Sequence, residues 1–186
     1  MSDNTLPLGH GVAVYCAAAD QIDPVFPATA REMGRLLAQA GITLVNGGGR
    51  MGLMGATIDG ALEAGGKAIG VLPQFMIDKG WAHPGLTETI ATPTMHVRKQ
   101  TMASLSRAVV ALAGGVGTLD ELCEMMAWSQ LGIFTGPVII VNTEGFYDPM
   151  IDMFNRMFEM GFMRNGRIPA TVVTTPQEAM EVILNA

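Results

Sequence analysis

Residues 108–118 read AVVALAGGVGT, an unbroken apolar run that leads directly into three closely spaced glycines. Apolar runs of this length are typical of strands buried on both faces of a parallel sheet. From Thr118 to Leu131, apolar side chains then recur at spacings of three and four, which predicts a helix. A buried strand, a glycine loop and a helix, in this order, indicate one unit of an α/β sheet.

The same alternation of apolar runs and helix-type segments continues through the rest of the chain. It predicts an α/β fold, a Rossmann-like doubly wound parallel sheet with helices on both faces. A chain of 186 residues suits one continuous core, so we expect residues 1–186 to form a single domain. Further strands are predicted at 12–17, 43–46, 68–72, 138–142 and 171–174, and further helices at 24–40, 53–64, 94–107, 147–160 and 176–184. Residues 73–93 show neither pattern and are interpreted as a long loop.

The composition excludes several classes of partner and location. The net charge is −6 and the basic residues form no cluster, which argues against a nucleic-acid partner or an anionic membrane surface. No window reaches the roughly 18 apolar residues of a membrane span. Cys16 and Cys123 stand far apart, without metal-ligand spacing. We therefore expect a soluble cytoplasmic protein with buried thiols, no metal site and no cofactor.

The surface is expected to be thinly charged. Hydrophobic residues make up 49% of the chain and charged residues only 15%. A single copy would leave apolar surface in water, so we expect a second copy to cover part of it. The contact is predicted on the methionine-rich helices around Met125, Met126 and Trp128 or over residues 150–160. The alternative is that these methionines fill the core.

A first glycine loop, Gly47–Gly52, follows the strand predicted to end at Asn46 and matches the dinucleotide pattern GxGxxG. That pattern also needs an acid at the end of the next strand to hold a ribose hydroxyl. The next strand instead runs into Leu72, Pro73 and Gln74, so NAD is disfavoured. The sequence also has no GK[ST] tripeptide of a nucleoside-triphosphate loop. The loop is either a tight turn that packs a helix closely or a phosphate cradle at a helix N-terminus.

A second glycine loop, Gly114–Gly117, allows the same two interpretations. Thr118 and Glu121 have the spacing of a capping box, in which both side chains would close the helix N-terminus. Glycines, however, carry an entropy cost, and two such clusters at strand ends favour a phosphate site.

Arg98 is expected to face inward. It shares a helical stripe with Met95, Met102 and Leu105. A buried guanidinium needs an anion, either an internal carboxylate or a phosphate held bidentately. Lys99, the next residue, reaches the same anion or is solvated, and His96 has no partner at ligand spacing.

Together these motifs resemble the LOG ("Lonely Guy") family of cytokinin riboside 5'-monophosphate phosphoribohydrolases, formerly labelled lysine decarboxylases. The resemblance extends from Val12 to about Phe162. Its most specific parts are GGGRMGLMG at 47–55 and GGVGTLDE at 114–121, with MHVRK at 95–99 between them. It implies a Rossmann-like homodimer that hydrolyses the N-glycosidic bond of a purine nucleoside 5'-monophosphate and releases free base and ribose 5-phosphate. Only three lysines occur, and none has the context of a pyridoxal site.

The resemblance also implies roles for individual residues. The second glycine loop would hold the 5'-phosphate, and Glu121 and Arg98 would be catalytic, with Glu121 beside the ribose. A carboxylate near the anomeric carbon would stabilise an oxocarbenium-like transition state or orient a water. The implied substrate-binding residues are Gly48, Gly49, Met95, Arg98, Lys99, Gly114, Gly115, Val116, Gly117, Thr118 and Glu121.

The chain departs from the family pattern at several places, and two of them motivate an alternative function. Ala17, Ala18 and Ala19 stand where the family commonly has Gly-Ser-Ser, and Gly80 stands where it often has Glu. Both changes lie on the base or ribose side. An alternative function is therefore a non-catalytic nucleotide-binding or sensing module on the same fold.

Overall fold

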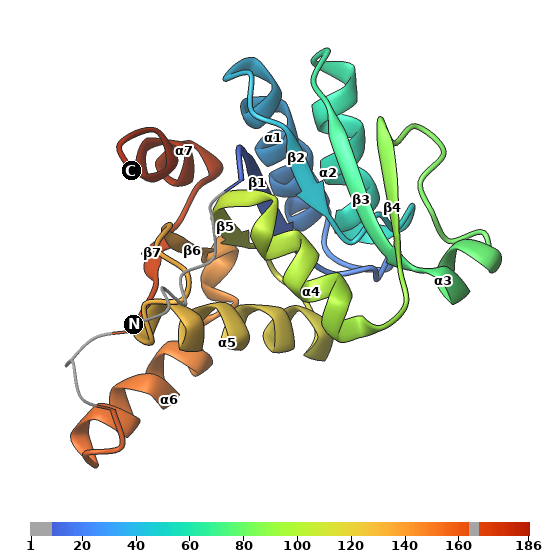
Figure 1. Cartoon of the computed structure of the whole chain (residues 1–186). Helices are drawn as coiled ribbons and strands as arrows, with labels where there is room; N and C mark the ends of the chain where they lie inside the picture. Colours follow the sequence, from blue (N-terminus) through green and yellow to red (C-terminus); the bar gives the residue numbers. More distant parts are fainter. Residues whose placement is uncertain (1–8, 164–167) are drawn as a thin grey trace.

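The strands form one seven-stranded, fully parallel sheet in the order β4-β3-β2-β1-β5-β6-β7 (Figure 1). The computed structural model describes residues 9–163 and 168–186. The strands are β1 (Gly11–Tyr15), β2 (Leu44–Asn46), β3 (Ala68–Pro73), β4 (Glu88–Thr92), β5 (Ser106–Ala111), β6 (Val138–Val141) and β7 (Thr171–Val173). The helices are α1 (Val25–Gln39), α2 (Gly52–Glu63), α3 (Gln74–Asp78), α4 (Met95–Ser104), α5 (Val116–Gln130), α6 (Asp148–Glu159) and α7 (Pro176–Leu184), with a 3-10 turn η1 (Thr143–Gly145).

Two hydrophobic cores lie on opposite faces of the sheet, which confirms the predicted fold class. Successive side chains of β1 point to opposite faces of the sheet. Val12 and Val14 pack in the first core, and Ala13 and Tyr15 pack in the second. The first core is covered by α1, α2 and α7, and the second by α4, α5 and α6. Central strands buried on both sides explain why their sequences are apolar runs instead of alternating ones.

The strand order reverses between β1 and β5. The chain moves outward from β1 through β2, β3 and β4, and then returns to β5 on the other side of β1. In open parallel sheets, ligands bind outside the carboxyl ends of the strands at such a point. The residues that follow β1, β2 and β5, including both glycine loops, are therefore brought together at one edge of the sheet.

The prediction of a long loop over residues 73–93 is wrong. This stretch contains the short helix α3 and the edge strand β4, which pairs in parallel with β3. Residues 88–92 read ETIAT and are mostly exposed, so they do not form an apolar run. An edge strand with one neighbour need not be buried, and its sequence therefore lacks the signal used for the central strands.

The predicted capping box at the start of α5 is also absent from the structure. The helix begins at Val116 with Gly115 as its N-cap, and Thr118 and Glu121 lie buried inside the helix. A capping box is instead present at α7, where Thr175 and Glu178 satisfy each other's backbone amides. Glu121 therefore does not close its own helix.

The methionine-rich helices differ in their burial. Met125 and Met126 lie in the second core, so the alternative of core filler is correct for them. On α6, judged over the described residues, no side chain is fully buried, and Met153 and the C-cap residue Met160 are more than half exposed. In the described part of the chain, no helix combines the length and the apolar character that crossing a bilayer requires.

Candidate functional site

The second glycine loop leaves the N-terminus of α5 open. Gly114 is required for packing, because a side chain there would overlap Thr118. At Gly115 and Gly117, in contrast, a Cβ atom would have no described atom within 4 Å. Within the described residues no side chain caps this helix, and the first amides of a helix have no partner inside it. The loop thus presents unpaired N–H groups and the positive end of a helix dipole to an open space.

Arg98 lies on the first turn of α4 and faces the sheet, as its position in the helical stripe predicted. Its Nε donates to the carbonyl oxygen of Val71 at 2.9 Å, and its Nη1 donates to Oε1 of Glu121 at 3.0 Å. Both charged side chains are about nine-tenths buried. Gly47 provides the space for the guanidinium, since a side chain there would overlap Nη2. The internal carboxylate considered as the partner of Arg98 is therefore Glu121, so both predicted catalytic residues form one buried pair.

Burial raises the pKa of Glu121 to about 7, while the neighbouring Arg98 charge opposes part of that rise. Two other titratable groups line the same space. Burial raises the pKa of the Tyr15 phenol far above its usual range and raises the pKa of the Cys16 thiol to about 12. Both groups therefore stay protonated near neutral pH. Glu121 is the lining side chain whose charge changes in that range.

Lys99 points away from this space. Its Nζ lies 3.0 Å from Asp120 and 3.3 Å from Glu124, both on α5. Burial alone would lower the pKa of Lys99, but the two carboxylates outweigh that effect and leave the pKa raised. The ion pairs hold α4 against α5 and thereby fix the distance between Arg98 and Glu121.

The first glycine loop uses its amides within the protein. Gly48 donates to the side chain of Asn46 at 2.8 Å, Arg50 to the carbonyl of Trp81 at 3.0 Å, and Gly52 to the carboxylate of Asp20 at 2.6 Å. The N-terminus of α2 thus has a carboxylate of the protein where a ligand anion would have to bind. Of the two interpretations of this loop, the geometry favours the tight turn with close packing.

Two adjoining cavities open at this edge of the sheet. The switch-point cavity, about 300 Å³, lies over the carboxyl ends of β1 and β5. Its walls are Val14, Tyr15, Cys16, Ala17, Ala18, Ala19, Gly47, Met54, Arg98, Gly115, Gly117, Thr118 and Glu121. The apolar cavity, about 440 Å³, is lined by Ala18, Gly47, Gly49, Arg50, Met51, Met54, Leu72, Met76, Trp81, Met95, Arg98 and Gly117. Arg98 and Gly117 belong to both, so one ligand can extend from one cavity into the other.

Sequence reasoning placed Met95 and Gly49 in the site but missed most of the apolar cavity. Met76 and Trp81 lie in the stretch interpreted as a loop. An exposed tryptophan between two glycine-containing turns was the available signal, because large aromatic side chains in loops often line binding sites.

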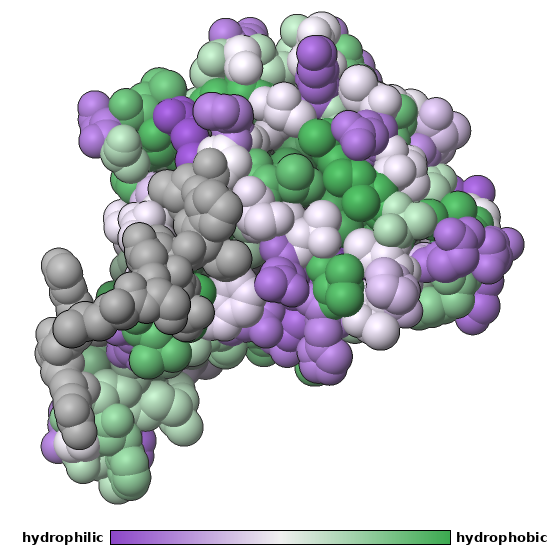
Figure 2. All heavy atoms as spheres, in the orientation of Figure 1, coloured by the Kyte–Doolittle hydropathy of each residue, from purple (hydrophilic) through white to green (hydrophobic). Residues whose placement is uncertain are grey.

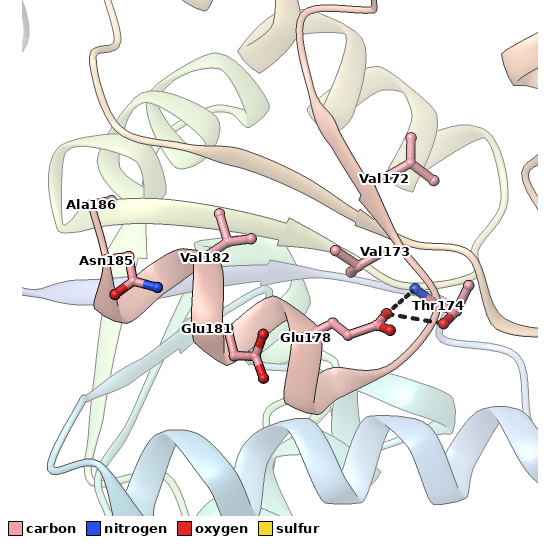
Figure 3. A pocket seen from close by; sticks show the side chains of 8 residues that line it. All are labelled: Val172, Val173, Thr174, Glu178, Glu181, Val182, Asn185 and Ala186. Atoms are coloured by element: carbon pink, nitrogen blue, oxygen red, sulfur yellow. Dashed lines mark hydrogen bonds between the residues drawn. The ribbon is translucent and has the colours of Figure 1, made fainter.

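A wider groove of about 760 Å³ lies between β7 and α7 (Figure 3). The carboxylate of Glu178 in this groove accepts hydrogen bonds from the backbone and hydroxyl of Thr174, which lower its pKa. These groups complete the start of α7, and the groove has no buried charge. We therefore place the candidate site at the two cavities beside Arg98.

Known proteins resemble this chain in sequence and in fold. The family model described as "Possible lysine decarboxylase" matches residues 54–183. A rice (Oryza sativa subsp. japonica) protein named "Probable cytokinin riboside 5'-monophosphate phosphoribohydrolase LOGL2" is 37% identical over 171 residues, 91% of this chain and 70% of the rice protein. The "Cytokinin riboside 5'-monophosphate phosphoribohydrolase" of Rhodococcoides fascians is 37% identical over 164 residues, 88% of this chain and 83% of that protein.

Among solved structures, the molybdenum cofactor binding protein of the phototrophic bacterium Rippkaea orientalis superposes with a TM-score of 0.73. The alignment covers 94% of this chain and 96% of that one at 22% identity, which establishes a shared fold alone. The family model and the two relatives go further, because each covers most of the chain. The chain belongs to the LOG family.

Proposed function

We propose that this protein hydrolyses the N-glycosidic bond of a purine nucleoside 5'-monophosphate, releasing the free base and ribose 5-phosphate. The names of its relatives support this activity. The observation that carries the proposal is the buried Arg98–Glu121 pair, which lies between an open helix N-terminus and an apolar cavity. An anion, a sugar and an aromatic base require those three environments in that order.

The phosphate binds at the start of α5. The amides of the second glycine loop and the helix dipole favour an anion there. Gly114 lets Thr118 pack closely, while Gly115 and Gly117 leave the approach free of side chains. Phosphate binding is remote from the bond that breaks, so its energy serves to position the sugar. The proposed phosphate-binding residues are Gly114, Gly115, Val116, Gly117 and Thr118.

The base binds in the apolar cavity. Methionine and tryptophan side chains there offer apolar and aromatic contacts to a planar ring and to an apolar substituent on it. Gly49 and Met95 line the apolar cavity directly. Gly48 contributes through the loop conformation, with a φ of 69° that favours glycine. AMP and N6-substituted AMP are both proposed substrates.

Glu121 and Arg98 act on the sugar. As the bond from C1' to the base breaks, positive charge develops on the ribose, and the Glu121 carboxylate stabilises it. Glu121 also orients the water that attacks C1'. That water supplies the hydroxyl of ribose 5-phosphate and the proton that the base carries away. A guanidinium is a poor proton donor, so Arg98 is assigned the role of holding the carboxylate and the ligand in place and not the role of the acid. Lys99, on α4, supports this geometry through its ion pairs with Asp120 and Glu124 on α5.

The test is chromatography of the products after incubation with AMP and N6-isopentenyl-AMP. The wild type should release free base, and Glu121→Gln should lower the rate by roughly a thousandfold, the scale of losing one electrostatic group in a catalytic site. Release of base at an unchanged rate by Glu121→Gln would exclude Glu121 from the mechanism. Nucleotide binding without base release by the wild type would favour the alternative, a binding or sensing module. The alanines at 17–19, which line the switch-point cavity without hydroxyl groups, motivate that alternative.

We also propose a homodimer whose contact includes α6. Apolar side chains remain uncovered on α6, and Figure 2 shows green, apolar side chains at the lower left, along α6, and over the sheet beside α4. Light scattering should report a dimer for the wild type and a monomer for Met153→Asp. Leu184→Asp, an equally exposed apolar position on α7, is the matched control and should stay dimeric. A monomeric wild type at micromolar concentration would contradict the contact. The Cys16 thiol is buried as expected, whereas the Cys123 thiol is exposed, contrary to the expectation. Both cysteines are free, which supports a cytoplasmic location that cell fractionation tests.

A further inference from the structure

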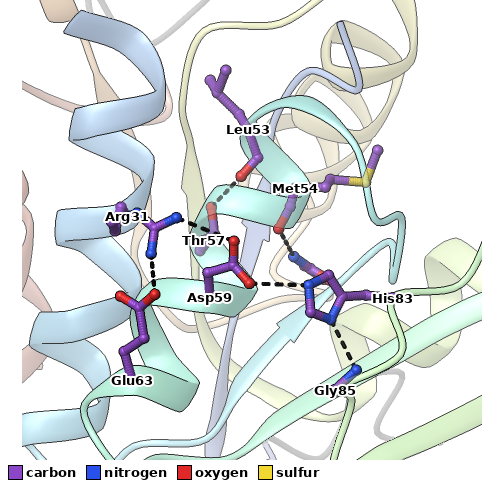
Figure 4. A network of polar contacts seen from close by, with 9 residues as sticks. Arg31, Leu53, Met54, Thr57, Asp59, Glu63, His83 and Gly85 are labelled. Carbon is purple, nitrogen blue, oxygen red and sulfur yellow. Dashed lines mark hydrogen bonds and ion pairs between the residues drawn. The ribbon is translucent and has the colours of Figure 1, made fainter. Parts of the chain in front are cut away.

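The ring of His83 is held by two neighbours in the segment between α3 and β4 (Figure 4). The backbone N–H of Gly85 donates to Nδ1 at 3.1 Å. Because Nδ1 accepts, Nε2 is the nitrogen that donates to Oδ1 of Asp59 on α2, also at 3.1 Å. The His83 side chain is only 12% exposed. A histidine so enclosed, and bound through both nitrogens, has one orientation.

Asp59 in turn is fixed by the helix layer. Its other carboxylate oxygen lies 3.1 Å from Nη2 of Arg31 on α1, and Arg31 also pairs with Glu63 (Figure 4). The chain Arg31–Asp59–His83 therefore connects two helices behind the sheet to a segment at its carboxyl edge. Among the described residues, it is the polar side-chain connection between this segment and the helix layer, and Leu86 adds an apolar one in the first core.

The same segment forms one wall of the proposed base site. Its backbone pairs with the first glycine loop: Arg50 donates to the carbonyl of Trp81, and His83 donates to the carbonyl of Gly48 at 2.8 Å. Gly49 and Ala82 form an antiparallel bridge. Trp81 lies two residues before His83 and lines the apolar cavity, although 46% of its surface is exposed.

The exposed side of Trp81 has little to hold it. The ammonium of Lys79 lies 4.9 Å from the centroid of the ring, an exposed cation–π contact that contributes modestly. The position of the indole therefore depends on the backbone of its segment. That backbone is fixed by the bridge to the first glycine loop on one side and by His83 on the other.

We infer that His83, held by Asp59, is a positioning residue that sets Trp81 as the wall of the apolar cavity and so selects nucleotides with an apolar substituent on the base. The inference rests on the proposed function for the identity of the ligand. It assigns a role to a network that touches neither the phosphate site nor the Arg98–Glu121 pair. Its effect should therefore fall on recognition of the base substituent and leave the chemical step unchanged.

The test compares N6-isopentenyl-AMP with AMP in kinetics and in calorimetric binding. Asp59→Ala and His83→Asn should raise the KM and the Kd for N6-isopentenyl-AMP about tenfold, the scale of losing one well-packed apolar contact. For AMP both constants should change less than twofold, and kcat should be retained for both nucleotides. Asn at 83 keeps an acceptor for Gly85 but does not reach Asp59, whereas Gln reaches Asp59. His83→Gln should therefore restore most of the preference.

Glu63→Ala is the matched control, because it removes the other partner of Arg31 without touching His83. It should leave the ratio of the KM values, and of the Kd values, for the two nucleotides unchanged. If the variants raise KM and Kd equally for both nucleotides, or if no variant changes the ratio of these constants between the nucleotides, the network only stabilises the fold. Either result would overturn the inference. If the wild type binds both nucleotides without releasing base, the proposed catalysis fails, but the ratio of the two Kd values still decides the inference. Binding of neither nucleotide would overturn both.

Discussion

The first glycine loop directs its amides at the protein, whereas the second leaves its amides and its surface open. Gly52 donates to Asp20, while the start of α5, at Gly115, has no side-chain cap among the described residues. A side chain at Gly47 would overlap Arg98, but one at Gly117 would meet open space. Glycine in the first loop thus serves packing within the fold, and glycine in the second leaves room for a ligand. Equal glycine content at the ends of two strands does not imply equal function.

Among substitutions in the two glycine loops, the largest effect is expected from Gly47→Ala. The added methyl would displace the guanidinium of Arg98 and separate it from Glu121. A shift of about 1 Å in a catalytic group costs roughly a hundredfold in rate, and an overpacked core costs about 1–3 kcal/mol in the free energy of unfolding. Steady-state kinetics and thermal unfolding measure the two losses. Unchanged kcat/KM would show that the first loop does not determine the position of Arg98.

The same substitution in the second loop should separate stability from activity. Gly117→Ala adds a methyl inside α5 without a clash, and it should stabilise the fold by about 0.5–1 kcal/mol because alanine favours the helix. The methyl would occupy the space of the ligand and raise KM about tenfold. A protein that is less stable, or one that is more stable with an unchanged KM, would remove the distinction between the loops.

Titration of Glu121, on the helix that follows the second loop, should change activity and stability in opposite directions as the pH falls. With the pKa of Glu121 raised by burial to about 7, kcat should fall several-fold as the pH drops from 7.5 to 6, since the carboxylate is the active form. A raised folded pKa means that the folded protein holds a proton that the unfolded chain has released. The contribution of Glu121 to stability is therefore full below about pH 4.5, the value for an unperturbed carboxyl, and is lost as pH rises through 7. Glu121→Gln should lack this component of the stability profile, and a kcat that rises as the pH falls would assign Glu121 the role of an acid.

The comparison of the loops also shows what sequence could predict. Apolar runs predicted the five central strands because strands inside a parallel sheet are buried on both faces. The edge strand β7 was predicted from its own valines although it is largely exposed, and the edge strand β4 lacked an apolar run. Spacing along α4 correctly placed Arg98 inside the protein. Its bond to Glu121 joins residues from two helices, so it depends on how α4 and α5 pack on the sheet. Local spacing suggested a capping box for Glu121 instead.

The smallest effect is expected from the residue that closes the first loop. Asp20 accepts from the amide of Gly52 at the N-terminus of α2, where a carboxylate also complements the helix dipole. Asp20→Asn keeps an acceptor oxygen and removes only the charge. It should cost about 0.3–1 kcal/mol in the free energy of unfolding and leave kcat and KM within twofold, which denaturant titration and kinetics can measure. If the first loop instead held the phosphate, removing this negative charge would strengthen nucleotide binding. A fall in KM on Asp20→Asn would therefore return the phosphate to the first loop and reverse the roles assigned to the two loops.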